Sequence, residues 1–174
     1  QVAAGVSHGI LTTASWVTSS SGDLNLTGTA GAAAGSFPIA LSAALTSSGN
    51  IIFNSAVGLT ATSSVTGGTG ATVNFTSTIN ATSAGSQGLT VSASSGTITF
   101  GGAIGATTAL GAFSASAGLI NVSNNITTSA GTITFTGPVT LTGTSTKSTG
   151  AGAAISFSGT ITATSAGSQA LTLT

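Results

Sequence analysis

This chain of 174 residues has almost no charge, no cysteine, no methionine and only two prolines. Charged side chains make up 1% of it, against roughly 25% in an average soluble domain. A single Lys cannot neutralise the phosphates of a nucleic acid or hold an anionic membrane surface. The absence of cysteine excludes a disulfide framework, and two prolines are too few for collagen. We therefore expect no nucleic acid partner and no membrane insertion.

The ionisable residues are too few for the common catalytic and metal sites. Asp23 is the only acid, and Lys147 and His8 are the only basic residues. A glycosidase needs two carboxylates, and metal sites need clusters of His, Cys, Asp or Glu. Ser7, His8 and Asp23 include the residue types of a hydrolase triad, but no Gly-x-Ser-x-Gly elbow sits between a strand and a helix. We predict a non-enzymatic protein with no catalytic, cofactor-binding or metal-binding residues and no cofactor.

An internal repeat is the strongest positive signal in the chain. Residues 48–91 recur about 82 positions later at 130–173, and residues 81–87 are copied letter for letter at 163–169. Self-similarity at a fixed period is typical of stacked-repeat proteins, in which each unit buries its apolar side against the next. The fold is therefore expected to present a long, regular surface.

Short stretches alternate apolar and polar residues, which predicts strands with one buried face. A recurring word reads Gly, any, apolar, any, apolar, and most copies lie 22–27 residues apart. The step from Gly118 to Gly131 is shorter, which indicates that two words lie on different sides of one coil. The word occurs at residues 22–26, 49–53, 96–100, 118–122 and 131–135, and weaker copies begin at Ala71 and Ala153.

Coils of 22–27 residues with about three short strands each predict an all-β parallel β-helix of about seven coils, roughly 35 Å long. Ile, Leu, Val and Phe would stack inside, and Thr, Ser and Asn outside. This fold requires Phe53, Phe75 and Phe100 to lie close together. We predict that residues 21–174 form the solenoid repeats. Residues 1–20 would be an N-terminal cap, with Ile10, Leu11 and Trp16 over the first coil, or a strand-donating segment.

The words at residues 96–105 and 163–174 resemble the repeats of filamentous-haemagglutinin-type adhesins and autotransporter passenger regions of bacterial surfaces. The resemblance covers residues 20–174 and lies in the style of the repeat. It implies a right-handed parallel β-helix, secretion to the cell surface, and a role in adhesion or as a spacer.

Several polar features allow other interpretations. A flat Thr surface would bind ice, if the pairs Thr97/Thr99, Thr132/Thr134, Thr140/Thr142, Thr160/Thr162 and Thr172/Thr174 point outward together. Carbohydrate binding is a further alternative for a β-solenoid. Short strands and the lack of Tyr argue against a transmembrane barrel. Glycosylation sequons, which allow surface glycans, occur at Asn25, Asn74, Asn80, Asn121 and Asn125.

Two local patterns are interpreted as loops. Residues 67–70, which read Gly-Gly-Thr-Gly, predict a turn, because a phosphate-binding loop would need a Lys and a following helix. The polar run around Lys147 predicts a solvated loop.

The sequence as a whole predicts a structural protein of an extracellular filament or an adhesin shaft. Its partner would be further copies of the same chain, joined end to end, laterally or by strand addition, because an uncharged surface lacks the repulsion that keeps proteins dispersed. Few ionisable groups also predict a structure that changes little with pH.

Overall fold

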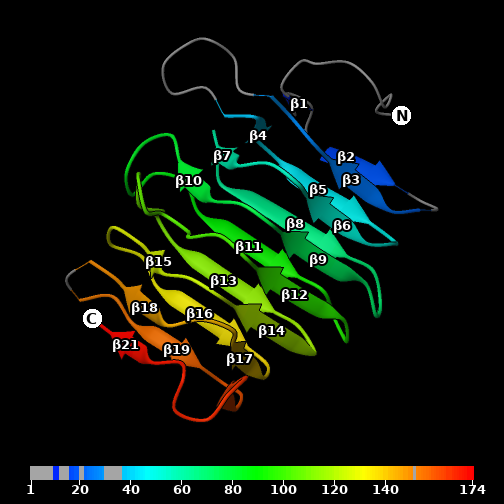
Figure 1. Cartoon of the computed structure of the whole chain (residues 1–174). Coiled ribbons are helices and arrows are strands. Elements are labelled where there is room, and N and C mark those ends of the chain that lie inside the picture. The colour runs from blue at the N-terminus through cyan, green and yellow to red at the C-terminus, as the bar shows by residue number, and fades with distance from the viewer. Residues whose placement is uncertain (1–9, 12–15, 20–21, 30–36, 151) are drawn as a thin grey trace.

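The computed structural model describes residues 10–11, 16–19, 22–29, 37–150 and 152–174. Within these residues the regular structure consists of short strands, and every strand pairing is parallel. The strands stack in three rows that run from one end of the molecule to the other (Figure 1). We name these rows face A, face B and face C, in the order in which the chain visits them. The predicted parallel β-helix is confirmed.

Two of the faces carry seven strands each. Face B consists of β2 (Trp16–Ser19), β5 (Ala44–Ser47), β8 (Ser63–Gly67), β11 (Leu89–Ser92), β13 (Phe113–Ser116), β16 (Ile133–Thr136) and β19 (Ile155–Phe157). Face C consists of β3 (Leu24–Leu26), β6 (Ile51–Phe53), β9 (Thr72–Phe75), β12 (Thr97–Phe100), β14 (Leu119–Val122), β17 (Val139–Leu141) and β20 (Ile161–Ala163).

Face A is less regular than the other two. Its strands fall into two groups, which the single bridge residue Ile104 joins by pairing with Ile79 on one side and Ile126 on the other. The strands are β1 (Ile10–Leu11), β4 (Ile39–Leu41), β7 (Val57–Leu59), β10 (Ile79–Ala81), β15 (Ile126–Thr127), β18 (Ser145–Ser148) and β21 (Leu171–Leu173). The interruption lies where the chain leaves the sheet between Ile104 and Leu110.

Part of the segment assigned to residues 1–20 belongs to the stacked sheets. Strand β1 pairs with β4, and β2 pairs with β5 in parallel register. The rest of that segment lies outside the described residues, as do the side chains of Ile10, Leu11 and Trp16. Its role as a cap or as a donated strand stays a prediction.

The core is a set of columns of inward-facing side chains, one column for each register position that faces inward. On face C, for example, Ile51, Val73, Ile98 and Ile120 pair in succession and are fully buried. Alternation follows from the strand geometry, since successive side chains point to opposite sides of a sheet. The Gly118 and Gly131 words begin strands on faces C and B, as the short step between them predicted.

Six phenylalanines form one continuous aromatic column inside the solenoid. Phe53 and Phe75 stack with ring centroids 4.3 Å apart, and Phe75 and Phe100 with centroids 5.5 Å apart. The predicted proximity of these three residues is confirmed. The column then passes from face C to face B through an edge-to-face contact of 5.2 Å between Phe100 and Phe113. Phe135 and Phe157 continue it on face B.

The 82-residue repeat does not correspond to a whole number of coils. Strand β6 on face C is repeated as β16 on face B, β7 on face A as β17 on face C, and β8 on face B as β18 on face A. The second copy is therefore turned by one face about the solenoid axis. The unit that repeats is the strand with its corner, and the same unit fits all three faces.

The copied residues 81–87 and 163–169 form the same turn twice. In each, a Gln side-chain oxygen accepts a hydrogen bond from a backbone N–H four residues earlier: Ser83 N to Gln87 Oε1 (3.0 Å) and Ser165 N to Gln169 Oε1 (3.1 Å). Gly85 and Gly167 occupy the left-handed region, with φ values of 75° and 74°. Glycine is required there because other L-residues are strained in that region.

Replacing Phe100 by Ala should lower the free energy of unfolding by roughly 3 to 5 kcal/mol, because it leaves a cavity in the middle of the aromatic column. Thr99→Ala, on the outward side of the same strand, is the matched control and should cost below about 1 kcal/mol. Urea titration followed by circular dichroism measures both values. Equal losses in the two variants would contradict the stacked column.

Gly167→Ala should destabilise the chain by about 1 kcal/mol through backbone strain alone, since a Cβ there meets nothing within 4 Å. Gly22 has the same open surroundings for a Cβ without a positive φ, so Gly22→Ala should change stability much less. Thermal unfolding of both variants tests the turn. A neutral Gly167→Ala would show that the turn is not held in the left-handed region.

Candidate functional surfaces

Of the three residues considered for catalysis, the structure describes only Asp23. Ser7 and His8 lie outside the described residues. Asp23 has a structural role: its Oδ1 accepts a hydrogen bond from Asn50 N at 2.8 Å and its Oδ2 accepts one from Asn50 Nδ2 at 3.3 Å. Asn50 Oδ1 in turn accepts from Thr72 N at 2.7 Å. These side chains extend the backbone ladder by one position on face C.

Two further findings concern metal ions and membranes. In the part of the chain that the structure describes, no three His, Cys, Asp or Glu residues lie together as metal ligands would. No helix among those residues is long and apolar enough to cross a membrane.

The predicted turn at residues 67–70 is confirmed, because Ala71 N donates to Gly68 O at 3.1 Å and Gly70 has a φ of 72°.

The prediction of a solvated loop around Lys147 is wrong. Lys147 lies in β18, its side chain is fully buried, and its register partners are Ile126 and Leu173. Its Nζ donates to Ser145 Oγ and, at 3.3 Å, to the backbone oxygen of Asn124. Burial lowers the pKa of Lys147 from 10.5 to about 8. The internal repeat carried the missing signal, since Lys147 occupies the position of the buried Val65.

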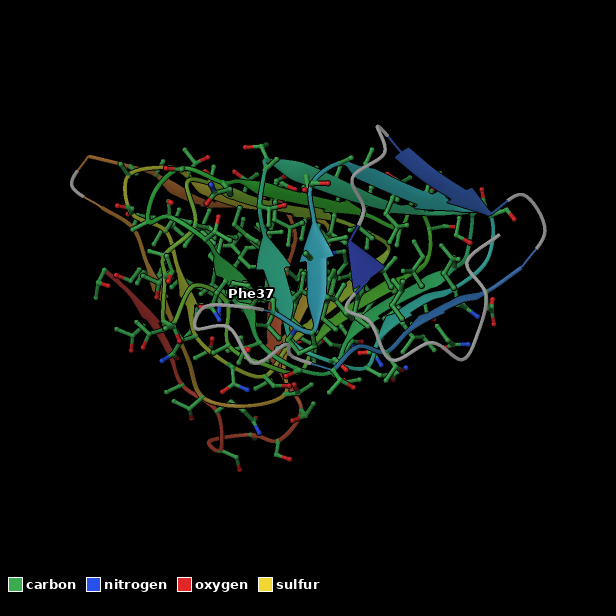
Figure 2. All side chains as sticks on the ribbon, turned by 90° about the horizontal axis from the view of Figure 1, so that it is seen from above. Phe37 is labelled. Atoms are coloured by element: carbon green, nitrogen blue, oxygen red, sulfur yellow. The ribbon has the colours of Figure 1, made fainter. Side chains whose placement is uncertain are left out.

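The three faces differ in what covers their outer sides. Face A is partly covered: a Cβ at Gly58 would overlap the ring of Phe37, which lies beside β4 and β7 (Figure 2). Farther along the same face, Asn80 Oδ1 accepts hydrogen bonds from Thr107 N at 2.9 Å and Thr108 N at 3.3 Å. Asn80 is 5% exposed, so its sequon is not accessible to a glycan.

Face C is open, and its polar side chains bond to one another along the axis. Asn121 Nδ2 donates to Thr99 Oγ1 at 3.4 Å, and the hydroxyls of Thr140 and Thr162 are 3.2 Å apart. Asn54 Nδ2 likewise donates to Thr27 Oγ1 at 3.2 Å. The outer groups of this face therefore satisfy part of their hydrogen bonding within the chain.

On face B no described residue is seen to cover the strands, and the outward positions from β8 to β16 carry only hydroxyl groups. They align in two columns because the strands pair without a register shift. Within the described residues these hydroxyls have no hydrogen-bond partner. Thr46 on β5 and Ser156 on β19 extend the columns by one position each. We call the whole set the hydroxyl face: Ser64, Thr90, Ser114, Thr134 and Ser156 in one column, and Thr46, Thr66, Ser92, Ser116 and Thr136 in the other.

The five Thr pairs proposed for ice binding do not share one surface. Three pairs lie along face C, at β12, β17 and β20, while Thr132/Thr134 lies at β16 on face B and Thr172/Thr174 at β21 on face A. The expectation that they point outward together is wrong. The rotation of the repeat by one face distributes similar words over all three faces.

The last described coil of the solenoid has exposed apolar side chains. Strands β19, β20 and β21 form the edges of the three faces at this end. The exposed large hydrophobic residues of the described chain, Ile161 (41%) and Leu173 (50%), both lie here, beside the half-buried Phe157. On β3, at the opposite edge of face C, Leu26 is only 5% exposed.

Comparison of the chain with models of protein families, with curated proteins and with solved structures finds no match.

Stability should rise with pH between about 8 and 10.5, because the unfolded chain keeps the Lys147 proton over this interval while the folded chain loses it. Below about pH 8 both states are protonated and the dependence should vanish. Since one pKa unit is worth ~1.4 kcal/mol, the full gain is roughly 3 kcal/mol. Urea unfolding at pH 7 and pH 10.5 measures it.

The variant Lys147→Met fills the same inward position without a charge and keeps every other titrating group. It should be more stable than the parent chain at pH 7 and lose the rise above pH 8. A rise that persists in this variant would assign the effect to another group, such as the terminal amine.

Proposed function

We propose that the chain is a non-enzymatic structural protein, a segment of a rigid extracellular filament or adhesin shaft in which copies of the chain join end to end. The apolar rung of the last described coil, at β19, β20 and β21, carries this proposal, because Ile161 and Leu173 are exposed there. Among the described strands each of these three has a neighbour on one side only, and unpaired strand edges are templates for pairing with another chain. A further coil of the same kind would supply both the backbone partners and the inward side chains.

The geometry of the interior supports end-to-end stacking. Ile161 continues the column that includes Ile120 and Val139, and Leu173 follows Ile126 and Lys147. A docked coil with apolar residues at every second position would extend these columns. At about 25 cal/mol per Å² of apolar surface, burying such a rung on top of three backbone ladders favours association.

Strand donation from the N-terminal segment receives less support. Strands β1 and β2 already pair with β4 and β5 of the same chain. Inserting them into a neighbour would first require breaking these ladders. We therefore favour stacking as the mode of assembly.

A place outside the cell, at the bacterial surface, is part of the same proposal. It is supported by the resemblance of residues 96–105 and 163–174 to adhesin repeats. A carbohydrate-binding solenoid has less support, because sugar-binding surfaces favour exposed aromatic rings, and six of the seven phenylalanines stand in the internal column. Antibody labelling of intact cells that make the protein tests the location.

Charged substitutions on the apolar rung should prevent assembly. In the double variant Ile161→Asp/Leu173→Asp, the concentration at which fibres appear should rise by about tenfold or more, since a buried unpaired charge costs several kcal/mol. Electron microscopy and sedimentation velocity measure the assembly.

The matched control is Thr162→Asp/Thr172→Asp, which places the same charges on the outer sides of the same two strands. This control should assemble like the parent chain. Monomeric particles of the parent chain at all concentrations would contradict self-assembly. An unchanged double variant of the apolar rung would exclude this end as the contact.

A further inference from the structure

The hydroxyl face is an array in two dimensions. Along the axis, neighbouring hydroxyls are separated by the strand spacing of about 4.8 Å, and across each strand by two residues, roughly 6.6 Å. The backbone ladders of β8, β11, β13 and β16 fix both intervals, since each strand pairs over its outward positions with its neighbours on both sides. The side chains are short, so their oxygen positions follow the backbone closely.

The hydrogen-bonding capacity of this array is directed outward. On face C, side chains such as Asn121 and Thr99 bond to one another. On the hydroxyl face, every hydroxyl keeps one donor and two acceptor positions for partners outside the described chain. A rigid array of unsatisfied hydroxyls at constant spacing holds water molecules at constant spacing.

The charge of the face restricts what it binds. The hydroxyl face has no formal charge, and the only acid and the only Lys of the chain lie elsewhere, on face C and inside the core. An ionic partner would find no counter-charge. The electrostatic complement is a neutral lattice whose members both donate and accept hydrogen bonds at every site, and water in a crystal has this property.

Two other occupants fit the face less well. A second copy packed face to face would bury many hydroxyls without assured partners, at about 1 to 3 kcal/mol for each one left unsatisfied. A polysaccharide would find no aromatic ring on the outward positions of β8 to β16, which carry only Ser and Thr. The Thr methyl groups between the hydroxyls are compatible with an ordered water layer.

We propose that the hydroxyl face binds the surface of ice crystals by ordering a layer of water over the two aligned columns of Ser and Thr side chains. This activity is separate from the assembly of the shaft, because it uses the side of the solenoid and the assembly uses its end. The binding face differs from the set of Thr pairs that the sequence indicated, of which only one lies on face B.

The test compares two single Lys substitutions with the same net charge. Thr134→Lys places the ammonium group in the middle of the hydroxyl face. Asn74→Lys is the control, since Asn74 also faces outward from a central strand, on face C, and its side chain makes no hydrogen bond to another described residue. Ice recrystallisation inhibition and the partitioning of the protein into a growing ice front are measured for both variants and the parent chain.

The parent chain and Asn74→Lys should inhibit recrystallisation and enter the ice at similar concentrations. Thr134→Lys should need a concentration about tenfold higher or more, because one lost lattice contact is worth roughly 1 to 3 kcal/mol. Circular dichroism of all three proteins checks that they fold alike. If Thr134→Lys misfolds, Ser114→Lys on the adjacent strand replaces it.

Three results would overturn the proposal. The first is an absence of inhibition by the parent chain at high concentration. The second is an equal loss of activity in Thr134→Lys and Asn74→Lys. The third is that the parent chain forms a dimer without ice activity and that Thr134→Lys converts this dimer to a monomer. This result would identify the hydroxyl face as a contact between copies. None of these results depends on whether the apolar end assembles fibres.

Discussion

In-register stacking of inward side chains is the interaction on which this solenoid depends. Each coil contributes short strands that cannot bury their apolar side alone, so every side chain in a column requires the ones before and after it. The phenyl rings of Phe53, Phe75 and Phe100 make this dependence visible, since each ring contacts the next one along the axis. The last described coil shows the same dependence, since Ile161 and Leu173, which have no further described coil packed against them, are the exposed large hydrophobic residues of the described chain.

Stacking in columns constrains the inward side chains but leaves the outward side chains free to vary. Outward positions do not affect the columns, and the three faces have become chemically different. Face A is covered by Phe37 and by the residues that bond to Asn80. Face C ties its amides and hydroxyls together along the axis, and face B leaves its hydroxyls without partners in the described chain. A chain built from one repeating word thus presents three different surfaces. Among the described residues, only face B carries a regular array of hydroxyl groups without hydrogen-bond partners.

Much of the fold was predictable because the strand period is two. Apolar residues at every second position identified the strands, and the interval between words identified coils. Lys147 was missed because its neighbours from Thr144 to Thr149 are all polar, so no alternation marks which side of the strand faces inward. Its register partners Ile126 and Leu173 decide that side. The expectation that the five Thr pairs share one surface was wrong for a related reason. The residues of a repeated word do not indicate which of the three faces the word occupies.

By itself, the sequence determined the strands, the stacked architecture and the near absence of charge, because these follow from local alternation, repetition and composition. Only the tertiary structure decided how the words are distributed over the faces. Coils differ in length, from the 18 residues that separate Ile39 from Val57 to the 29 that separate Ile10 from Ile39. Corners of unequal length shift where each word falls around the axis. Backbone pairing between coils, which joins residues far apart in the chain, then fixes the columns, the buried Lys147 and the hydroxyl face.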